Sequence, residues 1–129
     1  MKVLFLSDDE WNILNARYTF YAPKANCVFQ LHVVQEAKEI LEDNDLEDPS
    51  IVVYLDMAHS QTDDLMKELH RTGLSKKLIL GALCRPSHMQ EDIIFAAHYG
   101  AQFVMRPKLD LYRIVPEYLL KVREERGLT

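Results

Sequence analysis

The chain has 129 residues and a formal net charge of −5 at pH 7, from 20 acidic and 15 basic side chains. This length suits a single domain over residues 1–126 with a short tail at 127–129, and it can bury a core without disulfides. The acidic balance argues against a nucleic-acid surface, and no apolar run is long enough to span a bilayer. The two cysteines form no metal or redox spacing, so we expect them to be reduced in a cytoplasmic protein.

Five short apolar runs alternate with five segments of helical pattern along the chain. The apolar runs predict strands at 3–6, 27–34, 51–55, 77–83 and 101–105. The helical patterns lie at 10–22, at 34–44, around 65–69 with a stop at Gly73, at 91–100 and at 109–127. In the first of these helices the periodic apolar residues are Trp11, Leu14, Tyr18 and Tyr21.

This alternation predicts an α/β fold. Continuous apolar strands separated by helices indicate a parallel sheet that is covered on both faces. Right-handed crossovers then give a doubly wound five-stranded sheet in a three-layer α/β/α sandwich. Ligands bind beyond the carboxyl ends of the strands in such sheets, so we look for functional residues directly after each strand.

Acidic residues follow the first and the third predicted strands. Asp8 and Asp9 come after the run at 3–6, and Asp56 comes after the run at 51–55. If these strands are neighbours, three carboxylates meet in one pocket, where two like charges about 4 Å apart repel by about 4 kcal/mol at an effective dielectric of about 20. A divalent cation relieves this repulsion, and oxygen ligands suit Mg²⁺. Taken alone, Asp8 and Asp9 equally fit a helix N-cap and first-turn acid, and Asp56 fits a turn residue.

The ordered set of these features resembles the receiver domain of response regulators in two-component signalling, over essentially the whole chain. The segment VLFLSDDE at 3–10 is similar to the family's opening strand with its acidic pair, and IVVYLDM at 51–57 is similar to the strand that carries the phosphoacceptor aspartate. The segment EDIIFAAHYGA at 91–101 resembles the family's fourth helix, and RPKLD at 106–110 stands where the family has Lys-Pro.

The resemblance implies a phosphoryl switch in which Asp56 is the nucleophile and forms an acyl phosphate. Asp9 would bind Mg²⁺, with Asp8 assisting directly or through water, and the backbone carbonyl of Ala58 would complete the metal site. The phosphoryl donor would be a phosphohistidine on a histidine kinase or phosphotransfer protein. A downstream effector would bind the face that includes the family's fourth helix, fifth strand and fifth helix, which is also a possible homodimer face. The family members are signalling domains rather than metabolic enzymes.

Several positions depart from the family pattern. The lysine that contacts the phosphoryl group is replaced by Arg106, and Lys108 is the alternative base. Between them, Pro107 stands at the family's cis-proline position. The hydroxyl at the end of the fourth strand is missing, because Leu83 and then a cysteine stand there. The family's aromatic switch residue corresponds to Phe103, which has no hydroxyl group.

Two functional hypotheses follow from this comparison. In the first, a receiver domain accepts phosphate on Asp56 and changes its partner-binding face. In the second, a pseudo-receiver binds partners independently of phosphate. A phosphatase with Asp56 as its nucleophile is disfavoured, because the haloacid-dehalogenase pattern needs a second Asp where Ala58 stands. We favour the first hypothesis, because the three acids have no structural reason to stay together. The loop histidines His59 and His88 are not assigned to the site.

Overall fold

The computed structural model describes residues 1–21, 28–106 and 114–127 of the chain. Within these residues, five parallel strands form a sheet in the order β2-β1-β3-β4-β5. The strands are β1 (Lys2–Leu6), β2 (Gln30–Val34), β3 (Val52–Asp56), β4 (Ile79–Leu83) and β5 (Phe103–Met105). The doubly wound fold expected from the sequence is confirmed, and β1 lies directly beside β3.

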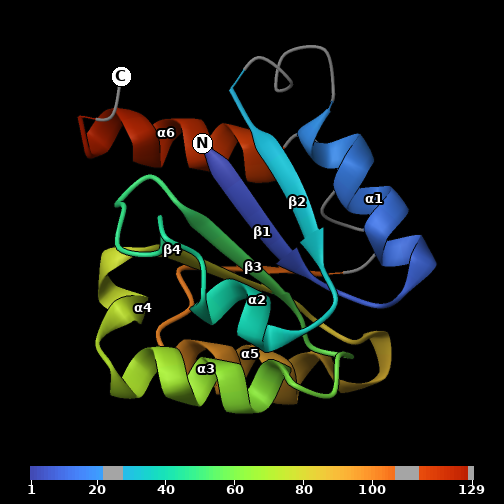
Figure 1. Ribbon diagram of the computed structural model, residues 1–129. Coiled ribbons are helices and arrows are strands. Elements are labelled where there is room, and N and C mark those ends of the chain that lie inside the picture. The colour runs from blue at the N-terminus through green and yellow to red at the C-terminus, as the bar shows by residue number, and fades with distance from the viewer. Residues whose placement is uncertain (22–27, 107–113, 128–129) are drawn as a thin grey trace.

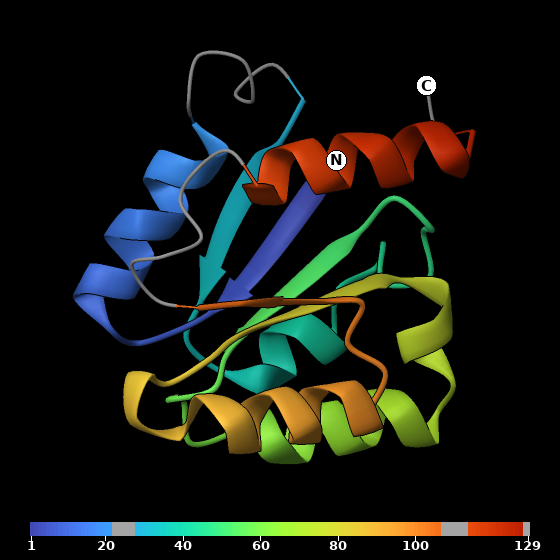
Figure 2. The same cartoon turned by 180° about the vertical axis from the view of Figure 1, so that it is seen from behind.

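Helices cover both faces of the sheet, as Figures 1 and 2 show from opposite sides. One face carries α1 (Glu10–Phe20) and α6 (Ile114–Glu125), and the other carries α2 (Ala37–Leu41), α3 (Thr62–Arg71) and α5 (Met89–His98). Two short elements complete the described part, α4 (Leu74–Lys77) and the 3₁₀ helix η1 (Pro86–His88). None of the described helices is both long and apolar enough to cross a membrane.

The predicted elements occur in the predicted order, with α4 and η1 as two additions. The short helix α4 follows α3 directly, and its last residue, Lys77, lies inside the run that predicts a strand at 77–83. Gly73 separates the two helices with a left-handed φ of 79°, a conformation that glycine adopts without strain. The fourth strand therefore begins only at Ile79.

Two apolar cores lie on the two faces of the sheet. β3 and β4 are buried at every position, as their continuous apolar runs predict. On the face of α3 and α5, Leu55 of β3 belongs to the same core as Leu69 of α3. On the face of α1 and α6, the rings of Phe5 and Tyr54 stack with 4.7 Å between their centroids.

Helix α1 is the element whose orientation the sequence does not predict. Its periodic apolar residues are exposed to solvent, Trp11 at 75% and Tyr18 at 62%. The residues that face the sheet come from the opposite side of the helix: Ala16, Thr19 and Phe20. Because both sides of α1 carry apolar residues, the spacing of Trp11, Leu14, Tyr18 and Tyr21 identifies a helix without showing which side is buried.

Phe103 of β5 packs against a strand position that has no side chain. It is paired in register with Gly81 of β4, and a Cβ atom added to Gly81 would lie 2.0 Å from Cζ of Phe103. The ring also lies near Tyr54 and Tyr118, at centroid distances of 5.8 and 5.7 Å. The expected switch residue therefore occupies a notch that only glycine leaves open.

We expect Gly81→Ala to displace this ring and to lower the free energy of unfolding by about 1–3 kcal/mol, the usual cost of overpacking a core. Urea denaturation of the variant and the wild type measures the change. In a Phe103→Ala background the same substitution should be neutral or slightly stabilising, because the notch is then empty. An equal loss of stability in both backgrounds would show that Phe103 is not what the new methyl group meets.

Candidate functional site

Asp56 ends the central strand β3 as a buried carboxylate with three hydrogen-bond donors. The residue is only 1% exposed. Its Oδ2 accepts hydrogen bonds from Oγ of Ser7 at 2.7 Å and from Nδ2 of Asn12 at 2.8 Å. Its Oδ1 accepts from the backbone N–H of Ala58 at 2.9 Å. Burial of a carboxylate destabilises the fold unless the carboxylate is hydrogen-bonded in this way, so these donors both stabilise and orient the Asp56 side chain.

The two side-chain donors come from the residue after the first strand and from the first helix. Ser7 directly follows β1, and the register that pairs Leu6 with Leu55 brings Ser7 beside Asp56. Asn12 lies in the first turn of α1. Neither residue is assigned from the sequence. The signal for Ser7 was its position at the end of the strand, whereas the role of Asn12 depends on where α1 begins.

The loop that follows Asp56 is held by its own side chains. The hydroxyl of Thr62 donates to the carbonyl oxygen of Asp56 at 2.6 Å. Nε2 of His59 lies 2.7 Å from the carbonyl oxygen of Gln35, and its Nδ1 accepts from the backbone N–H of Gln61 at 3.0 Å. A neutral ring protonated on Nε2 satisfies both contacts. His59 therefore fastens this loop to the loop after β2.

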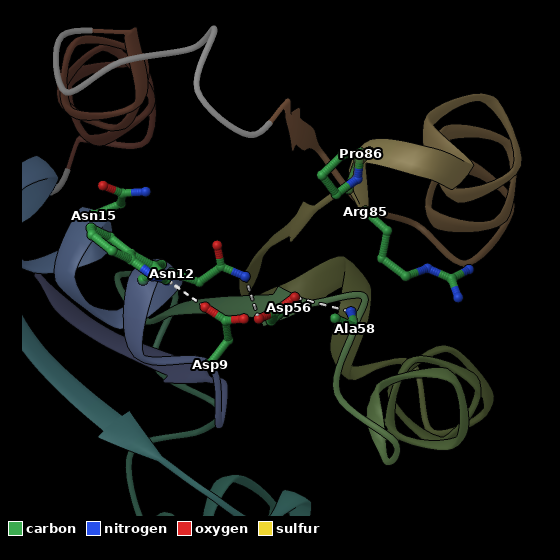
Figure 3. A pocket seen from close by; sticks show the side chains of 9 residues that line it. Asp9, Asn12, Asn15, Asp56, Ala58, Arg85 and Pro86 are labelled. Atoms are coloured by element: carbon green, nitrogen blue, oxygen red, sulfur yellow. Dashed lines mark hydrogen bonds between the residues drawn. The ribbon is translucent and has the colours of Figure 1, made fainter.

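A pocket of about 420 Å³ opens in front of Asp56. Its walls come from the start of α1, the end of β3 and the segment after β4: Asp9, Trp11, Asn12, Asn15, Asp56, Ala58, Cys84, Arg85 and Pro86. Figure 3 shows the carboxylates of Asp9 and Asp56 lying close to each other, with the amide of Asn12 above them. The pocket thus lies at the carboxyl edge of the sheet, where the topology predicts a ligand site.

The three acids predicted to converge do not all reach this pocket. Asp9 lines it, and this residue is also the N-cap of α1, because its Oδ1 accepts from the backbone N–H of Asn12 at 3.0 Å. Asp8 is exposed and does not line the pocket. The place beside Asp56, directly after β1, belongs to Ser7, which carries a hydroxyl rather than an acid. Within residues 1–21, 28–106 and 114–127, no three Asp, Glu, His or Cys side chains are close enough to hold a metal ion.

Two carboxylates therefore remain where the sequence suggests three. Mg²⁺ is commonly bound in proteins through one or two carboxylates and keeps several waters. Asp9 and Asp56 supply that number, and Ala58, whose carbonyl is the other predicted ligand, lines the same pocket. The residues present thus fit a magnesium ion without Asp8.

Two of the residues predicted to contact or detect the phosphoryl group, Leu83 and Arg106, directly end or follow strands at this edge of the sheet. Leu83 ends β4, is paired in register with Asp56, and is buried with no polar side-chain atom. Arg106 directly follows β5, is exposed, and is not among the residues that line the pocket. Pro107 and Lys108 lie outside the described residues, so the choice between Arg106 and Lys108 stays a prediction.

Arg85 borders the pocket, but its guanidinium group is turned away from Asp56 (Figure 3). It binds Asp92 of α5, which is 2% exposed, through Nε at 3.1 Å and Nη2 at 2.8 Å. The backbone N–H of Arg85 also donates to Asp92 at 2.8 Å. The hydrogen bonds to Asp92 hold the pKa of Arg85 above its usual value. The pair fixes the segment between β4 and α5.

Comparison with known proteins identifies the fold. No protein-family model and no curated protein matches the chain. A response regulator receiver domain from Methanospirillum hungatei is 16% identical with a TM-score of 0.59, and the match covers 97% of this chain and 91% of that one. A structure from streptococci, described as a redox sensor that evolved from two-component response regulators, is 16% identical with a TM-score of 0.67; the match covers 99% of this chain but 53% of that one. A structure described as an adenylate cyclase from Rhodopirellula baltica is 14% identical with a TM-score of 0.65, over 98% and 95% of the two chains.

Likeness at these identities shows the fold. The chain resembles response regulator receiver domains, and its five-stranded parallel sheet is the receiver-like, flavodoxin-like fold expected from the sequence.

Removal of the Ser7 hydroxyl tests how the Asp56 carboxylate is held. We expect Ser7→Ala to lower the free energy of unfolding by about 1.5–3 kcal/mol, the usual worth of a hydrogen bond to a charged group. In an Asp56→Ala background the same change should cost much less, and a double-mutant cycle in urea measures the difference. If the two backgrounds give the same loss, the serine acts through another contact, such as the hydrogen bond its Oγ accepts from the N–H of Asp9 at 3.2 Å.

Proposed function

We propose that this chain is a signalling receiver domain that accepts a phosphoryl group on Asp56 from a phosphohistidine of a histidine kinase or phosphotransfer protein. The observation that carries the proposal is the Asp56 carboxylate itself, buried at the end of β3 and lining a pocket at the carboxyl edge of the sheet. A carboxylate that served only the fold would not need a pocket in front of it. The receiver-like fold supports the same assignment.

The hydrogen bonds suggest which oxygen of Asp56 reacts. Oδ2 accepts from Ser7 and Asn12, whereas Oδ1 accepts only from the N–H of Ala58, so Oδ1 keeps more lone-pair density for attack. As the bond between Oδ1 and phosphorus forms, the bond between phosphorus and the donor's imidazole nitrogen breaks, and that imidazole leaves with the electron pair. Ser7 and Asn12 keep the carboxylate from rotating, which maintains the alignment that in-line transfer needs.

Mg²⁺ is the cofactor we propose, held by Asp9, Asp56 and the carbonyl of Ala58. When bound, this cation neutralises charge on the transferred phosphoryl oxygens. Asp8 has no part in the proposed site, because it lies outside the pocket. The base that contacts the phosphoryl group is Arg106 or Lys108.

The effector would bind the face made by α5, β5 and α6, which also remains the proposed homodimer face. The apolar side chains of Ile93 and Ile94 on α5 are 39% and 63% exposed, and in this proposal the effector covers them. In this proposal the chain acts in the cytoplasm and is not a metabolic enzyme.

A pseudo-receiver, which binds partners without phosphate, is the second candidate. Two observations favour it. Ser7 and Asn12 already stabilise the Asp56 carboxylate with hydrogen bonds, a task that a cation would otherwise perform. Leu83 also leaves the end of β4 without the hydroxyl that would detect a phosphoryl group.

Acetyl phosphate with Mg²⁺ separates the two candidates. We expect the wild-type chain to gain the mass of one phosphoryl group in intact-mass spectrometry, because a small donor needs only the nucleophile and the cation. Asp56→Asn should gain nothing. If the Asp56→Asn variant gains a phosphoryl group, the acceptor is another residue. A wild-type chain that stays unmodified while it still binds a partner would establish the pseudo-receiver.

Two matched substitutions test the magnesium site. Asp9→Asn keeps an N-cap residue, since asparagine caps helices as well as aspartate, but removes a charge from the pocket. We expect it to weaken Mg²⁺ binding about tenfold or more, by analogy with the loss of other metal-site residues. Asp8→Asn removes the same charge from the adjacent exposed position and should change the affinity less than about threefold, because solvent screens it. Isothermal titration calorimetry gives both values, and equal effects would contradict the assignment.

A further inference from the structure

The polar groups that line the Asp56 pocket are distributed unevenly. Helix α1 and its N-cap supply Asp9, Asn12 and Asn15 to the lining. The end of β4 contributes a buried cysteine there, and the last residue of the strand is Leu83. A thiol is a weak hydrogen-bond donor and a leucine side chain has none. The strong neutral side-chain donors in the lining therefore come from the helix.

Asn12 is the donor on α1 that already contacts the reacting group. Its Nδ2 lies 2.8 Å from Oδ2 of Asp56, and its backbone N–H binds Asp9, so it connects the two acids of the pocket. Figure 3 shows its amide between the helix and Asp56. Asn15, one turn further along, lines the same pocket, but in Figure 3 its amide lies farther from Asp56.

Ser7 and Asn12 donate to the same oxygen but differ in what they can do next. Ser7 is completely buried and does not line the pocket, so its hydroxyl stays with Oδ2. Asn12 is half-buried and lines the pocket, so its amide can reach a group bound there.

Phosphorylation changes where the negative charge lies. Before transfer, Oδ2 is part of a carboxylate. After Oδ1 has bonded to phosphorus, Oδ2 is the neutral carbonyl oxygen of an acyl phosphate, and the charge is on the phosphoryl oxygens. A hydrogen bond to an ionised acceptor is about twice as strong as one between neutral groups. The amide of Asn12 therefore gains by turning from Oδ2 toward the phosphoryl group.

From this geometry we infer that Asn12 is the residue that senses the phosphoryl group, in place of the hydroxyl missing from β4. The inference rests on the proposed function, because it assumes that Asp56 is modified. In this inference the first movement of the switch is the turning of the Asn12 amide, which belongs to α1. Phe103 is held in its notch over Gly81, whereas the amide of Asn12 is free to change its acceptor within the pocket.

The chain carries its own reporter for a test of this inference. Trp11 is its single tryptophan, it lines the pocket, and it is adjacent to Asn12. Beryllofluoride in the presence of Mg²⁺ imitates the phosphoryl group on a carboxylate, so its binding can be titrated through the fluorescence of Trp11. The substitutions to compare are Asn12→Ala and Asn15→Ala, which remove the same side chain from neighbouring turns of one helix.

We expect Asn12→Ala to raise the dissociation constant of beryllofluoride about tenfold, the loss that follows from one hydrogen bond to a charged acceptor. Asn15→Ala should raise it less than about threefold. The acyl phosphate made with acetyl phosphate should also be shorter-lived in Asn12→Ala. A residue that only orients the carboxylate would slow formation of the acyl phosphate and leave its lifetime unchanged.

Equal dissociation constants for the two variants, or an unchanged lifetime in Asn12→Ala, would overturn the role of Asn12 while leaving Asp56 as the acceptor. Failure of the wild-type chain to bind beryllofluoride would overturn both that role and the proposed function. The two failures are therefore distinguishable in one set of titrations.

Discussion

The burial of one charge organises the carboxyl edge of this sheet. Asp56 is 1% exposed at the end of a strand in which every position is buried. A carboxylate in that place is tolerated only when polar hydrogens surround it. Ser7, Asn12 and the N–H of Ala58 provide them, and each comes from a different segment: the end of β1, the start of α1 and the loop after β3. The same three hydrogen bonds that stabilise the buried Asp56 carboxylate also orient it toward the pocket.

The fold could be predicted because its signals are strong and local. Continuous apolar runs such as 51–55 leave little alternative to buried parallel strands, and Gly73 marks a helix end through its backbone conformation. The limits of α1 were visible for the same reason. Its orientation was not, because Trp11 and Tyr18 on one side and Phe20 on the other are all apolar, and only the packed sheet decides which of them is buried.

The sequence predicts the position of Asp56 but not which residues surround it. Asp56 follows the strongest apolar run, so its position could be read directly. The sequence places the end of β1 at Leu6 and the start of α1 at residue 10, as the structure has them. Which of Ser7, Asp8 and Asp9 turns toward Asp56 depends on the fold of these three connecting residues, and periodicity does not reveal it. With Asp9 as the cap, Asp8 lies outside the pocket and Ser7 stands beside Asp56. Asn12 contacts Asp56 across 44 positions of sequence, and no local sequence pattern reveals such a tertiary contact.

A crystal structure with Mg²⁺ and beryllofluoride tests the central claim, that Asp56 is a preoriented phosphoryl acceptor, more directly than any other measurement. The account predicts the beryllium on Oδ1 of Asp56, the cation between Asp56 and Asp9, and the hydroxyl of Ser7 still on Oδ2. Beryllofluoride bound at another residue would contradict the account. So would an empty pocket under saturating conditions, with Asp56 still hydrogen-bonded to all three of its donors.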